Sequence, residues 1–224
     1  MNGFIVLNKP KGMTSFAAVN AIHKLTRTKA GHAGTLDPMA EGVLIILLGA
    51  FTKKAKEFES SIKGYEAEMT FGIETDSLDS TGRITSKNEV SFTEQQLRDA
   101  MGRFIGDIDQ IPPMVSAIHY KGQRLYDLAR KGIEVERAPR KVTIEKLELK
   151  SFSGGKAEIL VSCSKGTYIR SLCADIGKEL GCGAVMSGLT RTRSGDYTLN
   201  NALTLEEVFR LHNLGQLEKA LCQT

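Results

Sequence analysis

The sequence lacks any long apolar run and has few cysteines. Its longest near-continuous apolar stretch, Val43 to Phe51, is far shorter than the roughly 20 residues that a membrane-spanning helix needs. The four cysteines (163, 173, 182 and 222) form no C-x-x-C pair, and the four histidines (23, 32, 119 and 212) are scattered. Neither set has the spacing of a zinc site. The start, MNGFIVLNKPKG, has no basic segment ahead of a long apolar one, so we expect no signal peptide and a cytoplasmic location.

Two common kinds of catalytic motif are also absent. The glycine-rich stretch GHAGTLDPMAEG, residues 31–42, matches neither G-x-x-x-x-G-K-[ST] nor a G-x-G-x-x-G that opens a helix. No G-x-S-x-G is present, so serine nucleophile chemistry is not indicated. There is no repeat, low-complexity segment or linker.

What is present is an ordinary globular composition with a mild basic excess. The chain has 224 residues, 41% hydrophobic and 25% charged, and a net charge of +4. This is enough for one core without disulfides. The excess is concentrated in clusters that together favour a phosphate-bearing partner: KLTRTK (24–29), KKAK (53–56), YKGQRLYDLARKG (120–132), RAPRK (137–141) and TRTR (190–193).

The patterns along the chain predict mixed strands and helices. Strands are expected at 3–8, 43–48, 65–71, 142–152, 157–163 and 184–190. Helices are expected to begin at Thr14 or Ser15, at Thr93 and at Thr204, and to span 124–131 and 167–180. A further short helix is expected after the strand at 43–48 and to end near residue 60. Because no strict βαβ rhythm is seen, we expect an α+β fold with a mixed, largely antiparallel central sheet flanked by helices. We expect a single domain over residues 1–224, with an excursion near 105–141.

Residues 31–42 raise a question about Asp37, which stands between a glycine-rich turn and Pro38. Taken alone, an Asp before a proline is usually a turn former. The same carboxylate could instead be held still for catalysis. The rest of the chain decides between these interpretations.

Six motifs occur in order: NKPKGMTS (8–15), GHAGTLDPMAEGVL (31–44), KGYEAEMTFGIETDSLDSTG (63–82), PPMVSAIHYKGQRLYDLARKGIEVERAPR (112–140), SKGTYIRSLCADIG (164–177) and LTRTRSGDY (189–197). Together they closely resemble the TruB family of tRNA pseudouridine-55 synthases, over essentially the whole chain. The resemblance implies the pseudouridine synthase fold. It also implies isomerisation of the T-loop uridine of tRNA, by base flipping, cleavage of the C1′–N1 bond and formation of a C1′–C5 bond.

The resemblance assigns catalytic roles to Asp37, Arg170 and Tyr65. Asp37 is the catalytic acid, Arg170 its ion-pair partner, and Tyr65 the ring that stacks on the flipped base. No cofactor or metal is implied. Hydrolytic glycosidases use two carboxyl groups, one of them to handle water or a covalent intermediate, whereas an isomerisation that excludes water can use one. Three paths stay open to Asp37: attack at C1′, addition at C6, or removal of a ribose proton.

Further residues match binding positions of the family or lie in basic clusters. The expected contacts with substrate or pocket are His32, Tyr168, Leu189, Lys9, Pro10, Lys121, Arg124, Arg130, Arg140 and Arg191. Family members usually continue into a small C-terminal RNA-binding module, most of which we expect to be missing after Thr224. The family's commoner residues at positions 33 and 190 are Thr and Arg, and this chain has Ala33 and Thr190, which suggests altered local contacts.

Two other functions are weighed against this hypothesis. One is a non-catalytic RNA-binding or tRNA-folding module that only grips a flipped base, which the complete set of Asp37, Arg170 and Tyr65 disfavours. The other is a nucleoside glycosidase, which would need a second positioned acid that the sequence does not offer. We expect a monomer that binds tRNA, no membrane and no protein partner.

Overall fold

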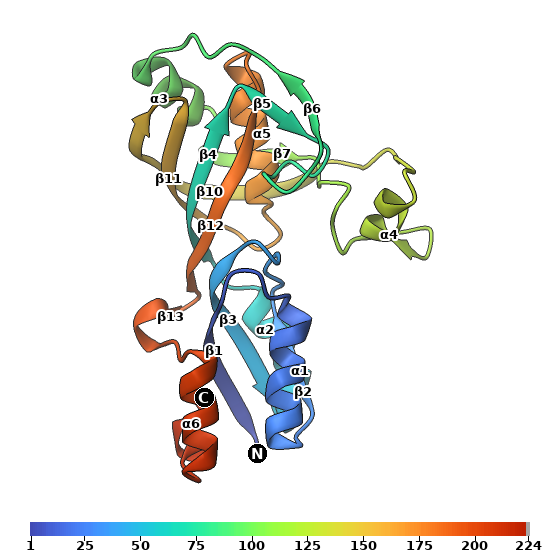
Figure 1. Ribbon diagram of the computed structural model, residues 1–224, viewed down its shortest axis with the longest axis vertical. Helices are drawn as coiled ribbons and strands as arrows, with labels where there is room; N and C mark the ends of the chain where they lie inside the picture. The colour runs from blue at the N-terminus through green and yellow to red at the C-terminus, as the bar shows by residue number, and fades with distance from the viewer. Residues whose placement is uncertain (223–224) are drawn as a thin grey trace. The chain divides into compact units, whose positions relative to one another are not determined.

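The computed structural model describes residues 1–222, which gather into two compact units (Figure 1). The first comprises Met1–Glu66 and the chain from Leu189 onward, and the second comprises Ala67–Gly188. Strands β4 (Lys63–Phe71) and β12 (Ala184–Ser194) contribute residues to both. The single-domain expectation for residues 1–224 stays a prediction.

The first unit is built around strand β3, which is buried on both faces. Its strands are β1 (Gly3–Lys9), β2 (Ala30–Ala33), β3 (Glu41–Leu48), β13 (Tyr197–Thr198) and the end of β12. β1 and β2 both pair antiparallel with β3. β12 runs parallel to the start of β3, with Arg191 opposite Gly42. Alternate residues of β3 enter two apolar clusters, one containing Leu44 and Ile46 and the other Val43 and Ile45. This explains why its sequence is apolar without alternation.

Helices cover this sheet, and two of them begin at capping residues that the sequence predicts. The unit contains α1 (Ser15–Thr26), α2 (Ala55–Glu59) and α6 (Leu205–Asn213), with short 3₁₀ turns η1 (Gly49–Lys54), η2 (Leu199–Asn201) and η3 (Leu217–Ala220). The Thr14 hydroxyl accepts a hydrogen bond from the Ala17 N–H at the start of α1. Thr204 and Glu207 form a reciprocal capping box at the start of α6.

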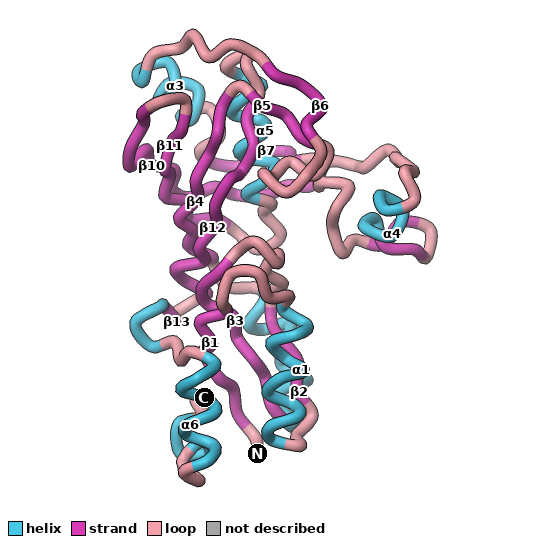
Figure 2. Tube along the Cα trace, in the orientation of Figure 1, coloured by secondary structure: helices cyan, strands magenta, loops and turns pink. Residues whose placement is uncertain are grey.

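The second unit is a sheet of strand order β12-β4-β11-β10-β7 (Figure 2). Its further elements are β5 (Ile73–Thr75), β6 (Ile84–Lys87), α3 (Glu94–Gly102), β7 (Gly106–Gln110), β8 (His119–Tyr120), β9 (Gln123–Arg124), α4 (Leu125–Arg130), β10 (Arg140–Ser153), β11 (Lys156–Cys163) and α5 (Ile169–Glu179). β10 and β11 form the expected antiparallel hairpin. The predicted mixed, largely antiparallel sheet with flanking helices is confirmed.

Seven short strands were not expected from the sequence, among them β2, β5, β6 and β7. β2 lies inside the stretch interpreted as a loop, β7 follows α3, and β5 and β6 flank the polar turn at residues 76–82. Each is five residues or shorter, so none carries a readable alternation. They pair because a longer strand or partner offers an open edge, which is a tertiary effect. Among residues 1–222, no helix has the length and apolar character needed to cross a membrane.

Candidate active site

The loop that carries Asp37 links β2 to β3 and is bounded by two glycines. Gly34 and Gly42 have φ angles of +77° and +104°, a backbone region in which side chains other than glycine are strained. Asp37 itself is half-buried. The loop therefore turns sharply at both ends, and these turns hold a single carboxylate at its centre.

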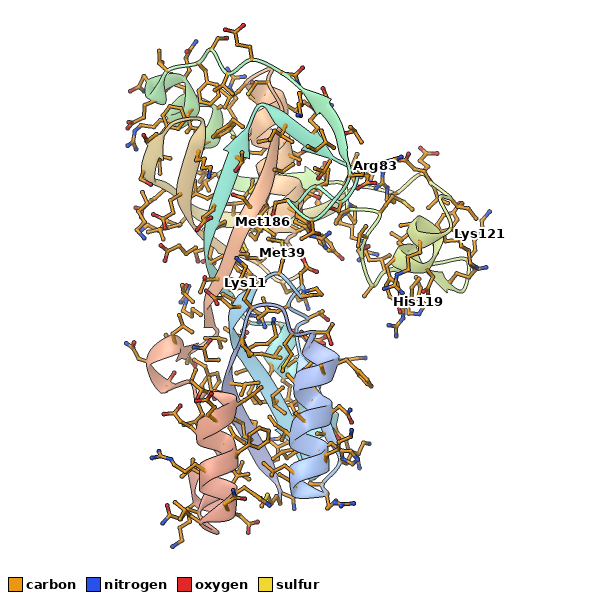
Figure 3. All side chains as sticks on the ribbon, viewed as in Figure 1. Lys11, Met39, Arg83, His119, Lys121 and Met186 are labelled. Carbon is orange, nitrogen blue, oxygen red and sulfur yellow. The ribbon has the colours of Figure 1, made fainter. Side chains whose placement is uncertain are left out.

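Hydrogen bonds to the backbone fix the residues on both sides of Asp37. The buried Ser15 hydroxyl accepts from the Leu36 N–H and donates to the Leu36 carbonyl, both at 2.9 Å. The Gly12 N–H donates to the Pro38 carbonyl at 2.7 Å, and the Ala40 N–H donates to the Asp37 carbonyl at 3.1 Å. Figure 3 shows Lys11 and Met39 on these two adjacent loops. Rigid backbone anchoring of this kind preorganises a catalytic group.

Lys9 is a second anchor and is fully buried. Its ammonium donates to the carbonyls of Ala40 at 2.5 Å, Met13 at 2.6 Å and Pro10 at 3.0 Å. Burial lowers the pKa of Lys9 to about 8, while the carboxylates of Asp37 and Glu41 oppose this shift. The Asp37 carboxylate therefore lies within electrostatic reach of a buried cation of its own unit.

Arg191 is 1% exposed and lies against both ends of the same loop. Its Nε donates to the Val43 carbonyl at 2.7 Å, and its terminal nitrogens donate to Gly34 at 2.9 Å and Thr35 at 3.4 Å. Within the described chain neither Arg191 nor Lys9 forms a salt bridge. Both cations are thus satisfied by backbone carbonyls, an arrangement that sequence clusters do not reveal.

Four more predicted residues lie in the first unit. His32, on β2, is half-buried; burial and the Arg191 charge lower its pKa, so the imidazole is neutral at pH 7. Its buried Nδ1 has no hydrogen-bond partner among residues 1–222. Tyr65 and Leu189 are half-buried and pack against the core cluster that includes Leu36. Pro10 is exposed, and only its carbonyl takes part in the anchoring.

In the second unit, Arg170 is the second residue of α5 and is 4% exposed. It lies 3.7 Å from the Asp79 carboxylate, which is also buried, and donates to the carbonyls of Ser77 and Val115 at 3.2 and 2.9 Å. The other Asp79 oxygen accepts from the hydroxyls of Ser77 and Thr81 at 2.8 and 2.6 Å. A buried guanidinium with this many fixed partners has one orientation.

Tyr168 precedes Arg170 and is held through its backbone. The Gln110 side chain, 2% exposed, accepts from the Tyr168 N–H at 2.7 Å and donates to the Tyr168 carbonyl at 3.1 Å. Ser171 donates to the Ile111 carbonyl at 2.9 Å. The edge strand β7 and the residue after it therefore fix the start of α5, which carries both Tyr168 and Arg170.

Three of the four predicted basic contacts of this unit gather in the excursion around α4. Lys121 lies over the ring of Tyr120 at 5.4 Å, and the guanidinium carbons of Arg124 and Arg130 lie 5.8 and 5.4 Å from the centre of the Tyr126 ring. All three are exposed. Figure 3 shows His119 and Lys121 projecting outward from this segment. Arg140 is exposed too, but stands apart at the start of β10.

The residues that sequence reasoning missed are mostly those that hold the others. Ser15 was seen only as a possible helix cap, although its hydroxyl anchors Leu36. Asp79 lies in the same motif as Asp76, and the sequence does not show which of the two carboxylates lies near Arg170. Gln110 carried no signal. Among residues 1–222, no group of three or more His, Cys, Asp or Glu side chains could hold a metal ion.

Comparison with known proteins identifies the class to which this fold and loop belong. Residues 23–169 match the family model for the N-terminal domain of TruB family pseudouridylate synthases. Residues 170–223 match the model for the C-terminal domain of tRNA pseudouridylate synthase B. The chain belongs to the TruB family, which confirms the resemblance found in its motifs.

Relatives agree with this assignment. The chain is 49% identical over 215 residues to tRNA pseudouridine synthase B of Alkaliphilus oremlandii, covering 96% of this chain and 72% of the relative. It is 46% identical to the protein of that name from Dechloromonas aromatica, covering 99% of this chain and 74% of the relative. Among solved structures it resembles a chain of a Cbf5–Nop10–Gar1 complex, with a TM-score of 0.78 and 30% identity. The match covers 98% of this chain and 59% of that one.

Proposed function

We propose that this chain is a tRNA pseudouridine synthase, which isomerises the uridine at position 55 in the T-loop. The observation that carries the proposal is the loop of Asp37. This chain, a member of the family, holds the Asp37 carboxylate between two glycine turns. Hydrogen bonds fix the backbone on both sides of it, at residues 36–40. This fixed backbone geometry supports a catalytic role for Asp37.

The reaction needs no second acid, because its leaving group is also its acceptor. The C1′–N1 bond breaks, the uracil turns, the C1′–C5 bond forms, and the proton of C5 is lost to solvent while N1 regains one. A charged carboxylate in a closed pocket is costly unless it is paired. Lys9 already supplies a positive charge beside Asp37, and we propose that Arg170 is its ion-pair partner, as the family resemblance implies.

The remaining predicted contacts receive roles that fit their burial. Tyr65 is proposed to stack on the flipped uracil, and Leu189 and Tyr168 to shape and dry the pocket. Half-buried side chains can do this, because one face stays available to a ligand. The neutral His32, with its partnerless Nδ1, is proposed to contact the nucleotide or the space that it vacates.

Binding of tRNA is proposed to rely on phosphate contacts around the T stem-loop. Lys121, Arg124 and Arg130 are exposed beside tyrosine rings, and Arg140 is exposed at the start of β10, so all four can reach a backbone. We further propose that the chain acts as a monomer in the cytoplasm without a cofactor or a protein partner, which sedimentation with and without tRNA would test.

Asp37→Asn is the decisive substitution. A T-loop minihelix labelled with tritium at C5 of the target uridine should release tritium with the unaltered chain and none with Asp37→Asn, while filter binding shows equal affinity for the RNA. Asp196→Asn, at an exposed turn of the same unit, is the matched control and should keep full turnover.

Each rival function has its own outcome in this assay. Tritium release at the full rate by Asp37→Asn would refute the assigned role. Binding without any release by the unaltered chain would identify an RNA-binding or folding module. Free uracil in the supernatant, measured by chromatography, would identify a glycosidase.

A further inference from the structure

Arg191 belongs to the basic cluster TRTR, from which we predicted contact with a phosphate. The residue is instead 1% exposed, and all three guanidinium nitrogens donate to carbonyls at the two ends of the Asp37 loop. A phosphate contact needs a solvent-facing donor, which Arg191 does not present. The structure therefore gives this residue a task that its sequence neighbourhood does not suggest.

The three accepting carbonyls lie at the two ends of one loop. Gly34 and Thr35 open it, and Val43 follows its close. A guanidinium is a rigid planar fork with five N–H donors, so one side chain can bridge both ends at a fixed separation. An ammonium group is compact and cannot span them in the same way.

The two glycine turns also lie against Arg191. A Cβ at Gly42 would collide with the Arg191 backbone carbonyl and approach its nitrogen to 2.9 Å, and a Cβ at Gly34 would lie 3.6 Å from a terminal nitrogen of the guanidinium. The parallel bridge places the Arg191 backbone directly opposite Gly42. The backbone of Arg191 thus packs against one end of the loop, and its side chain contacts both ends.

We propose that Arg191 is a positioning residue for catalysis, which closes the loop from Gly34 to Val43 and so fixes the carboxylate of Asp37. This inference rests on the proposed function, since it names how the same site is held. It predicts that Arg191 acts on the chemical step and not on binding. A displacement of about 1 Å at a catalytic group can cost about 100-fold in rate.

The test uses Arg191→Lys, which retains the charge, and Arg191→Met, which removes it. Both should lower the single-turnover rate by about 10- to 100-fold, leave the affinity for T-loop RNA unchanged, and leave the salt dependence of binding unchanged. Hydrogen exchange should quicken at the amides of Leu36 and Ala40. Val208→Ala creates a cavity in the apolar cluster that also contains Leu36, but it removes none of the loop's hydrogen bonds, so it should lower stability and keep the rate.

Distinct results would overturn the proposal. An unchanged rate and unchanged exchange in Arg191→Lys would remove the positioning role. A salt slope reduced by about one, with weaker binding, would mark Arg191 as a phosphate contact. If Val208→Ala lost as much rate as the Arg191 variants, the rate loss would be a consequence of lower stability and not of a displaced Asp37. If the unaltered chain forms no pseudouridine, the proposed function fails, and the exchange experiment still decides whether Arg191 orders the loop. If Arg191→Met does not fold, Arg191→Lys carries the test.

Discussion

The hydroxyl of Ser15 offers a sharp quantitative test of how the Asp37 loop is held. It makes two hydrogen bonds of 2.9 Å to the backbone of Leu36, and it is 3% exposed. In Ser15→Ala, the N–H and the carbonyl of Leu36 lose their partner in a site closed to solvent. Each buried unsatisfied group costs about 1–3 kcal/mol, so we expect the loss of both bonds to destabilise the chain by about 2–6 kcal/mol.

Ser194 provides a control with the same chemical change. It is 2% exposed on β12 in the same unit, and its hydroxyl has no hydrogen-bond partner in the described chain. Ser194→Ala removes one buried oxygen without orphaning another group, so we expect a change between zero and about 1 kcal/mol of stabilisation. The two variants thus separate loss of a side-chain oxygen from loss of its bonds.

Urea unfolding followed by circular dichroism measures the free energy of unfolding of each variant. Single-turnover kinetics measures whether the chemical step assigned to Asp37 slows. The midpoint of Ser15→Ala should fall clearly below that of Ser194→Ala, with an unchanged slope. Its rate on T-loop RNA should fall as well, because Leu36 is the residue before the carboxylate. Equal midpoints in the two variants would refute the anchoring role of Ser15.

Three further outcomes are expected. Burial lowers the pKa of Lys9 to about 8, so between about pH 8 and 10.5 the unfolded chain binds more protons than the folded chain. The free energy of unfolding should therefore rise with pH across this window, by up to about 3 kcal/mol. Urea titrations of Lys9→Met should lack that rise. Asp79→Ala removes a buried carboxylate that lies beside the Arg170 guanidinium and accepts from the hydroxyls of Ser77 and Thr81, and it should cost about 3–5 kcal/mol in the same assay. Asp76→Ala, in an exposed pair, should cost less than about 1 kcal/mol. Lys121→Ala should reduce the salt slope of RNA binding by about one without changing the rate of bound RNA; an unchanged slope would remove it from the interface.

The sequence alone determined the elements with strong local signals. Thr14, Thr93 and Thr204 cap helices in the structure, because a capping hydroxyl and its N–H lie within three residues of each other. The hairpin of β10 and β11 was readable for a similar reason, since its partners are joined by a short turn. Asp37 became a catalytic candidate through the resemblance of six ordered motifs to one family, because the glycines and the proline around it indicate by themselves only a turn.

Only the tertiary structure decided what holds that motif in place. Ser15 meets Leu36 across 21 residues, and Arg191 meets Val43 across 148. No local pattern encodes such pairings, because they form when separate strands and helices pack. A cluster of basic residues looks the same in the sequence in two different cases. The side chain of a member can face solvent, as that of Lys121 does, or it can be buried and donate hydrogen bonds to backbone carbonyls, as that of Arg191 does. Burial separates the two, and burial is a property of the packed chain.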